Sequence, residues 1–192
     1  MDSLNLERAE AYIEKSFISN RDADALFASL KADTPWRQDV IKMWGKEIPI
    51  PRLQQWYGDN SKTYTWSGIK LQPLPWTEAL LKIKEKIEAV SDLKFNSVLL
   101  NYYRNGKDSV GWHSDSEKEL GANPFIASLS LGVTRNFQLK ANWDDNLKLS
   151  IPLTNGSLLL MKSGVQQNWK HQIPKQPLIL GERINLTFRN IL

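Results

Sequence analysis

The chain contains only two histidines, and both lie in patterns that could bind a metal ion. His113 opens a His-x-Asp triplet that ends at Asp115, and His171 follows much later. Two imidazoles and one carboxylate form the 2-His-1-carboxylate ligand set, which binds Fe(II) and leaves coordination positions open. The same ligands can hold zinc, but zinc hydrolases usually carry a glutamate base in a motif such as His-Glu-x-x-His, which this sequence lacks. The pattern therefore favours an iron site, in which these three residues are both the metal ligands and the catalytic residues.

A short segment near the C-terminus could bind an organic acid. Arg183, Asn185, Thr187 and Arg189 alternate with other residues, so on a strand they share one face. Two cations that point into a protein interior are costly unless they meet anions. A dicarboxylic acid would satisfy both guanidinium groups through paired hydrogen bonds. The alternative is that these arginines pair with an Asp or Glu of the protein itself.

Apolar residues at helical spacing predict three helices in the first half of the chain. The first is expected over residues 4–15, and the second begins at a cap formed by Ser19 or Asn20 and ends at Thr34. The third begins at Thr77, and its inward-facing residues are expected to be Leu80, Ile83, Ile87 and Val90.

From residue 95 onward the apolar period becomes two, which predicts strands. The expected strands are Phe95–Tyr103, Pro124–Leu131, Arg135–Lys140, Leu147–Leu153, Ser157–Met161, Asn168–Ile173 and Arg183–Ile191. The dipeptide Asn155-Gly156 is typical of a β-hairpin turn. The predicted fold class is α+β and mainly β, a double-stranded β-helix (jelly-roll) barrel with helices packed on one side. In such a barrel His171 can lie across the lumen from His113.

Residues 36–75 are rich in Trp, Tyr, Pro and Gly, and they predict short strands and loops, with one strand over 62–66. A loop-rich segment of this composition is a candidate recognition surface. We find no repeat or linker, so one domain is expected over residues 1–192. Within it, about 1–35 would be a helical preamble, 36–75 the recognition segment and 95–191 the barrel core.

Composition limits the classes of function. The chain has 192 residues, a net charge of +4 and no cysteine, which excludes disulfides, thiolate metal sites and cysteine nucleophiles. The mild positive charge favours polyanionic partners. The eight tryptophans serve either a core or stacking on bases. No secretory signal and no membrane span are evident, so we expect a monomer in the cytoplasm, or in the nucleus of a eukaryote.

Taken together, these motifs closely resemble the AlkB family of Fe(II)- and 2-oxoglutarate-dependent dioxygenases, in particular its animal-type nucleic-acid demethylases. The motifs that carry the resemblance are Asn101-x-Tyr103, His113-x-Asp115, His171 and Arg183-x-Asn185-x-Thr187-x-Arg189. The resemblance extends over about Trp36 to Arg189. It implies that Fe(II), 2-oxoglutarate and O2 are the cofactors. It also implies that 2-oxoglutarate is bound by Asn101, Tyr103, Arg183, Asn185, Thr187 and Arg189.

The resemblance further implies oxidative demethylation of 1-methyladenine and 3-methylcytosine in alkylated DNA or RNA, with release of formaldehyde and repair of the damage. A methylated Watson–Crick edge must leave the duplex to react. The residues expected to contact the base or its strand are Trp44, Tyr64, Trp66, Ser116 and Glu117. Trp44 would be a wedge in the base stack, or alternatively a core residue. Two other functions stay open: a 2-oxoglutarate hydroxylase of a small molecule or protein side chain, and a non-catalytic jelly-roll module that binds nucleic acid.

Overall fold

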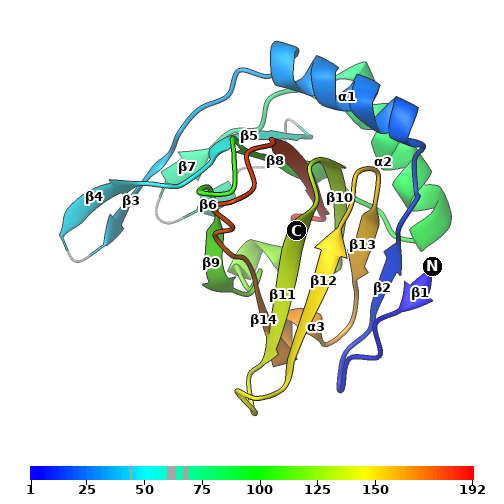
Figure 1. Ribbon diagram of the computed structural model, residues 1–192, viewed down its shortest axis with the longest axis vertical. Helices are drawn as coiled ribbons and strands as arrows, with labels where there is room; N and C mark the ends of the chain where they lie inside the picture. Colours follow the sequence, from blue (N-terminus) through cyan, green and yellow to red (C-terminus); the bar gives the residue numbers. More distant parts are fainter. Residues whose placement is uncertain (44, 60–63, 67–68) are drawn as a thin grey trace.

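Two antiparallel sheets make up most of the molecule (Figure 1). The computed structural model describes residues 1–43, 45–59, 64–66 and 69–192, and the side chains of 42–43, 64–66 and 69–71 lie outside the description. The large sheet contains, in spatial order, β1 (Asp2–Ser3), β2 (Ala11–Glu14), β13 (Leu158–Met161), β10 (Ile126–Gly132), β15 (Arg183–Arg189), β8 (Ser97–Tyr103) and β5 (Leu53–Gly58). The small sheet contains β12 (Lys148–Leu153), β11 (Arg135–Ala141), β14 (Trp169–Ile173) and β9 (Val110–His113).

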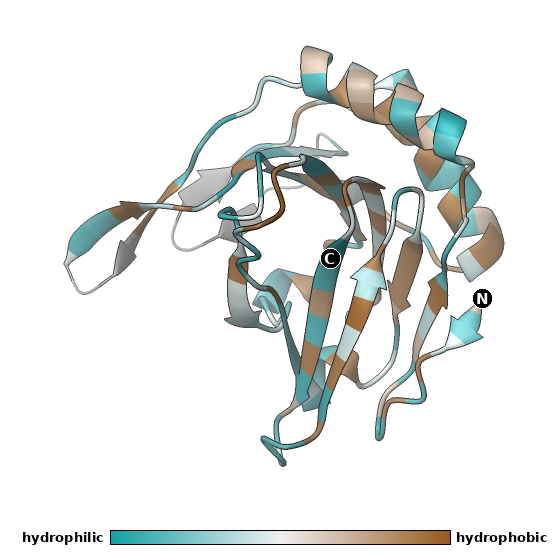
Figure 2. Cartoon of the chain, viewed as in Figure 1, coloured by the Kyte–Doolittle hydropathy of each residue, from teal (hydrophilic) through white to brown (hydrophobic). Residues whose placement is uncertain are grey.

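The seven strands expected from residue 95 onward are all present, with ends shifted by one or two residues. The burial pattern explains which face each strand presents. β11 alternates between buried and half-buried residues, so Phe137 and Leu139 face the other sheet while Gln138 and Lys140 face outward. Figure 2 shows the corresponding alternation of hydrophobic and hydrophilic bands along β11. β10 and β15 are buried on both faces, because helices cover the outer side of the large sheet and the small sheet covers its inner side.

The two long helices lie on the same side of the large sheet (Figure 1). α1 (Asn20–Asp33) begins at Ser19, whose side chain accepts a hydrogen bond from the amide of Asp22, and this confirms the predicted cap. α2 (Glu78–Ser91) begins at the predicted cap Thr77. Short helical turns follow at η1 (Lys118–Leu120) and α3 (Val165–Asn168). Among the described residues, no helix is long and apolar enough to cross a membrane.

The prediction of the buried face of α2 is wrong at one residue, Val90. Leu80, Ile83 and Ile87 are buried as expected, but Val90 is 53% exposed and Ser91 is buried in its place. With 3.6 residues in each turn, the position above Ile87 falls between residues 90 and 91. Packing of α2 against the sheet decides that Ser91 is the buried residue, and the local sequence gives no information about this packing.

The helix predicted over residues 4–15 is also wrong. β2 lies in this segment and pairs with β1, which precedes it, and with β13, so that Ile13 lies opposite Leu159. Two residues between the strands, Asn5 and Arg8, have positive φ, which a helix does not allow. Without β2, the backbone of β13 would lie at the edge of the sheet with unpaired N–H and C=O groups, and a strand can form there. The hydrogen bonds gained by this pairing cannot be predicted from the local sequence.

The turn Asn155-Gly156 does not form a β-hairpin between paired strands. It joins β12 of the small sheet to β13 of the large sheet, so the chain changes sheets at this point. Gly156 has a φ of +75°, and a Cβ atom there would lie 2.5 Å from the carbonyl oxygen of Ile18. The glycine is therefore required by a close approach of two backbones.

The described residues between 36 and 75 form short strands and loops, as predicted, and of the strand expected over 62–66 only 64–66 belong to the described residues. β3 (Val40–Met43) pairs with β4 (Lys46–Pro49), and β6 (Tyr64–Trp66) pairs with β7 (Ile69–Leu71). β5, in the same segment, joins the edge of the large sheet next to β8. Figure 1 shows the β3–β4 ribbon extending away from the body of the molecule.

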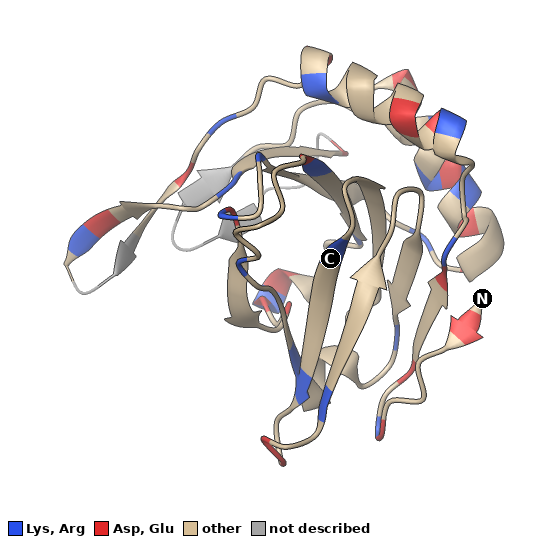
Figure 3. Ribbon diagram, viewed as in Figure 1, with Lys and Arg blue, Asp and Glu red and all other residues tan. Residues whose placement is uncertain are grey.

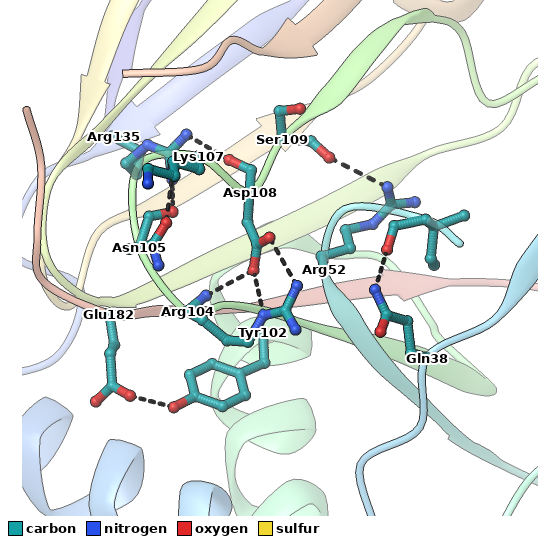
Figure 4. Close-up of polar contacts among 11 residues, drawn as sticks. Gln38, Arg52, Tyr102, Arg104, Asn105, Lys107, Asp108, Ser109, Arg135 and Glu182 are labelled. Carbon is teal, nitrogen blue, oxygen red and sulfur yellow. Dashed lines mark hydrogen bonds and ion pairs between the residues drawn. The ribbon is translucent and has the colours of Figure 1, made fainter. Parts of the chain in front are cut away.

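An ion pair between the buried carboxylate of Asp108 and the partly exposed side chain of Arg104 holds the loop that connects β8 to β9 (Figure 4). The Asp108 carboxylate accepts hydrogen bonds from the backbone amide, Nε and Nη2 of Arg104 at 2.8–2.9 Å. Arg135, which is fully buried, donates to the carbonyl oxygens of Asn105, Asp108 and Pro174. This loop is thereby tied to the chain that follows β14.

The pKa of Asp108 makes this ion pair dependent on pH. Burial raises the pKa, but the hydrogen bonds and charge of Arg104 outweigh burial, and the net pKa lies below its ordinary value. A carboxyl group with a depressed folded-state pKa stabilises the fold above its unfolded pKa of about 3.9. That contribution is lost as the pH falls through the folded-state pKa.

We predict that Asp108→Asn lowers the free energy of unfolding at pH 7 by about 1–2 kcal/mol, because the charge-assisted hydrogen bonds of a buried carboxylate are lost while its partner Arg104 is partly screened by solvent. The difference from the wild type should shrink between about pH 5 and pH 3. Urea denaturation at several pH values measures both. Asp145→Asn removes an exposed pair with Lys140 and should change stability much less than Asp108→Asn does, because solvent screens exposed charges. A pH-independent difference for Asp108→Asn would contradict the role of the ion pair.

Candidate metal centre and acid-binding cavity

A cavity of about 510 Å³ opens between the two sheets. Its walls come from β8 and β15 of the large sheet and from β9 and β14 of the small sheet. The predicted ligands of iron and of the organic acid all line it: His113, Asp115, His171, Asn101, Tyr103, Arg183, Asn185, Thr187 and Arg189. The fold thus brings together residues that lie as far apart in sequence as Asn101 and Arg189.

The three candidate metal ligands converge because β9 pairs with β14. His113, the last residue of β9, lies directly opposite His171, and the two ring centroids are 4.3 Å apart. Asp115 follows two residues later. The ligand atoms of the three residues lie within 4.8 Å of one another, and His171 Nε2 is 4.0 Å from Asp115 Oδ2. Two atoms bound to one ion at about 2.1 Å can be up to about 4.2 Å apart, so this last pair fits a shared ion.

The protonation states also suit a metal. Burial lowers the pKa of His171 to about 3, so its imidazole is neutral at pH 7. Burial raises the pKa of Asp115, but the positive charge of Arg189 and the two imidazoles outweigh it, and the net pKa lies below its ordinary value. Neutral imidazoles and ionised carboxylates are the forms that bind metal ions. His113 Nδ1 lies 2.9 Å from the carbonyl oxygen of Gly111, which leaves Nε2 of His113 for the ion.

Gln166 holds the backbone of Asp115 in place. Its side-chain Oε1 accepts a hydrogen bond from the amide of Asp115 at 2.9 Å, and its Nε2 lies 3.6 Å from Met161 Sδ. The glutamine is buried and belongs to α3, the turn just before β14. Sequence reasoning missed it because a glutamine in such a turn carries no motif.

Arg183 fits the role of an anion-binding residue. It is 1% exposed, and its Nη2 donates to Ser130 Oγ at 2.9 Å. Its Nε and Nη1 have no hydrogen-bond partner among the described residues. Burial lowers its pKa to about 10, so the side chain is still charged at pH 7. A buried guanidinium without a carboxylate partner is costly, and an organic acid in the cavity would offset that cost.

Arg189 differs from Arg183 because it already meets a carboxylate of the protein. Its Nη2 donates to Asp115 Oδ1 at 2.8 Å. The alternative that the clamp arginines pair with a protein acid is therefore realised at Arg189. Its predicted contact with 2-oxoglutarate stays a prediction.

Between the arginines, hydrogen bonds fix the polar side chains of the cavity. Asn185 Nδ2 donates to Ser128 Oγ at 2.8 Å, and Thr187 donates to Asn185 Oδ1 at 2.9 Å. Asn101 Oδ1 accepts from Arg52 Nε at 2.8 Å. Arg52, like Arg183 a buried cation of the cavity, was expected from the sequence only as a candidate phosphate contact. Its position just before β5 gives no alternation that would mark it as a residue of the cavity.

The predicted substrate contacts are only partly described. Glu117 lines the cavity, and its Oε2 is buried without a hydrogen-bond partner among the described residues. Ser116 is exposed. Trp44 lies outside the described residues, and so do the side chains of Tyr64 and Trp66, whose backbones form β6.

Comparison with known proteins identifies the class of protein to which this fold and this site belong. The profile of the 2OG-Fe(II) oxygenase superfamily matches residues 10–189, so the chain belongs to that superfamily. It is 42% identical over 184 residues to a Bos taurus protein named alpha-ketoglutarate-dependent dioxygenase alkB homolog 3, with 91% of this chain and 64% of the relative covered. It is 36% identical over 182 residues to a Homo sapiens protein named DNA oxidative demethylase ALKBH2, with 89% of this chain and 69% of the relative covered.

These relatives confirm the predicted AlkB family, and Fe(II), 2-oxoglutarate and O2 are the cofactors of the superfamily. The chain spans 64% of the length of the bovine relative. The solved structure titled "The structure of OsALKBH1" matches with a TM-score of 0.67 at 20% identity, and covers 97% of this chain and 100% of that chain. At this identity the likeness concerns the fold alone.

We predict that Gln166→Ala weakens Fe(II) binding about tenfold, because residues that orient a metal ligand typically contribute that much. Anaerobic titration with Fe(II) measures the affinity. Gln167→Ala is the matched control, since Gln167 belongs to the same turn but donates to the carbonyl oxygen of Ala122. Equal losses in both variants would mean that the turn as a whole matters, and not the bond to Asp115.

Arg183→Met should raise the KM for 2-oxoglutarate by about 100-fold or more, because removing one partner of a buried charge pair costs about 3–5 kcal/mol. The affinity for Fe(II) should stay within a few-fold of the wild type. Ser130→Ala keeps the guanidinium and removes one hydrogen bond, so its effect should be below about tenfold. An unchanged KM in Arg183→Met would remove this residue from the acid site.

Proposed function

We propose that this protein is an Fe(II)- and 2-oxoglutarate-dependent dioxygenase that removes N-methyl groups from alkylated bases of DNA or RNA. The observation that carries the proposal is the placement of three metal-binding side chains and one uncompensated arginine in the same cavity. The printed names of the relatives, a dioxygenase and a DNA oxidative demethylase, support both the reaction and the substrate class.

Within this proposal, the residues of the cavity divide into two groups. His113, Asp115 and His171 would hold Fe(II). Arg183 would bind one carboxylate of 2-oxoglutarate through its Nε and Nη1. The polar side chains beside it would complete the contacts with the acid, and these are Asn101, Tyr103, Asn185, Thr187 and Arg189. When bound, the metal and cosubstrate supply the oxidation, in which O2 converts 2-oxoglutarate to succinate and carbon dioxide and hydroxylates the methyl group.

The protein contributes binding, orientation and exclusion of water. Asp115 keeps its charge through Arg189, so the metal site keeps its negative ligand. Glu117 would accept a hydrogen bond from the exocyclic amino group of adenine or cytosine, since its Oε2 is buried and has no partner among the described residues. The hydroxymethyl group on nitrogen then leaves as formaldehyde: its hydroxyl proton passes to solvent, the C–N bond breaks, and the electron pair of that bond returns to the ring nitrogen.

The substrate must enter as a single base. A cavity of about 510 Å³ has the size of a small-molecule pocket and cannot admit a base pair within a duplex. The enzyme would therefore act on single strands or on a base that is turned out of the stack. Trp44, Tyr64, Trp66 and Ser116 remain the proposed contacts with the base and its strand.

We also infer that the two sheets form a double-stranded β-helix. From β8 to β15 the chain places four strands in each sheet. The order β8-β15-β10-β13 in the large sheet and β9-β14-β11-β12 in the small sheet supports this topology. We propose that residues 1–192 form one such domain, which works as a monomer in the compartment that holds its nucleic acid, the cytoplasm or the nucleus.

Turnover should fall below about 1% of the wild type in His113→Ala and in His171→Ala, because each removes one of three metal ligands. The substrates are single- and double-stranded DNA and RNA oligonucleotides that carry 1-methyladenine or 3-methylcytosine, and mass spectrometry measures loss of the methyl group. Circular dichroism should show that both variants stay folded. Wild-type protein that consumes 2-oxoglutarate but demethylates none of these oligonucleotides would indicate another substrate, such as a small molecule or a protein side chain.

A further inference from the structure

The outer face of the small sheet carries a row of three lysines. Lys140 of β11 lies opposite Lys170 of β14 on one side and opposite Lys148 of β12 on the other. Residues directly opposite each other in a sheet point to the same face. The neighbouring residues Leu139 and His171 point into the molecule, so the three lysines point outward. Figure 3 shows basic residues near the end of the small sheet where β11 ends and where β12 and β14 begin. We name these three residues the lysine row.

Only part of the charge of the lysine row is balanced. Asp145, in the turn after β11, lies 2.9 Å from Lys140 Nζ. The hydrogen bond from Lys140 and the charges of Lys140, Lys148 and Lys170 lower the pKa of Asp145. This one carboxylate therefore interacts with all three ammonium groups. The other nearby acid, Asp144, accepts a hydrogen bond from the amide of Asn146. Like charges placed opposite each other in a sheet are unfavourable, and an anionic partner would relieve their repulsion.

Trp112 connects the lysine row to the cavity. Its ring is 38% exposed, although it lies beside the candidate metal ligand His113, and it belongs to the lining of the cavity. The Lys140 ammonium lies 5.6 Å from the centroid of the same ring. A continuous path therefore leads from the cavity across an exposed aromatic ring to three cations.

We propose that Trp112 and the lysine row are a second contact for the nucleic-acid strand whose modified base enters the cavity. Trp112 stacks on a base next to the modified one, and the lysines bind the phosphates that follow. Aromatic rings beside cations are the combination that binds single strands without regard to sequence. β12 and β14, which flank β11, are about 10 Å apart, a span long enough to contact the backbone of a nucleic-acid strand. This inference rests on the proposed function.

The test compares substrates of two lengths. A trinucleotide centred on 1-methyladenine fills the cavity but does not reach the lysine row, whereas a single strand of about 12 nucleotides reaches both. In Lys148→Ala/Lys170→Ala, the Kd for the longer strand should rise about tenfold or more at low salt. The slope of log Kd against log salt should fall by about 1.4, since each lysine accounts for about 0.7. The kcat/KM for the trinucleotide should be unchanged.

The matched control is Lys82→Ala/Lys86→Ala. These exposed lysines belong to α2, which covers the outer side of the large sheet, away from the small sheet. The change in net charge is the same, so a general effect of charge would weaken binding equally in both double variants. Equal weakening would overturn the proposal.

A pair of substitutions tests the aromatic ring separately. Trp112→Ala should weaken binding of the longer strand about fivefold or more, because stacking on one base typically contributes that much. Trp112→Phe should restore most of it, since a ring is kept. Equal losses in the two variants would overturn the stacking role.

Failure of this inference can be told apart from failure of the proposed function. If the wild type demethylates both substrates, but Lys148→Ala/Lys170→Ala binds the longer strand as tightly as the wild type, the lysine row is not a contact and the enzyme activity stands. If the wild type neither binds nor demethylates either substrate, both proposals fall.

Discussion

The pairing of β9 with β14 is the constraint on which the site depends. This register puts His113 opposite His171, and a shift by one residue would turn one imidazole to the outer face of the sheet. The same alternation that directs His171 inward directs Lys170 outward. One ladder of backbone hydrogen bonds therefore sets the geometry of the candidate metal centre and also the position of the basic face behind it.

Charge determines what the cavity can accept. Two buried arginines line it, Arg52 and Arg183, together with the half-buried Arg189. Asp115 and Glu117 line the same cavity, and a further lining pair, Arg37 and Asp39, balances its own charge. Asp115 takes a hydrogen bond from Arg189 and stays ionised, which is the form that a metal requires. Arg183 keeps two donors without partners among the described residues. The excess of buried positive charge thus favours an anionic ligand beside the metal, and the family to which the chain belongs uses such an acid.

Support for this cavity comes from segments that perform no chemistry. Gln166 in the turn before β14 fixes the amide of Asp115, and the Arg104–Asp108 pair holds the loop that leads into β9. Both hydrogen-bond a buried group, the amide of Asp115 in one case and the carboxylate of Asp108 in the other, and such groups are costly to leave without a partner. Ligand geometry in this fold therefore depends on residues that no motif would select.

The sequence by itself determined the chemistry of the site. Two histidines and an aspartate are the candidate metal ligands, and the alternation from Arg183 to Arg189 puts the candidate acid-binding residues on one face, because residue type and strand period are local properties. Only the tertiary structure decided that Arg189 meets Asp115 and that Gln166 supports the metal ligand. It also decided that residues 11–14 form a strand where a helix was expected. These outcomes depend on which distant segments become neighbours. A pairing between strands or a contact inside a cavity produces no periodic pattern in the sequence, so it cannot be predicted from residue spacing.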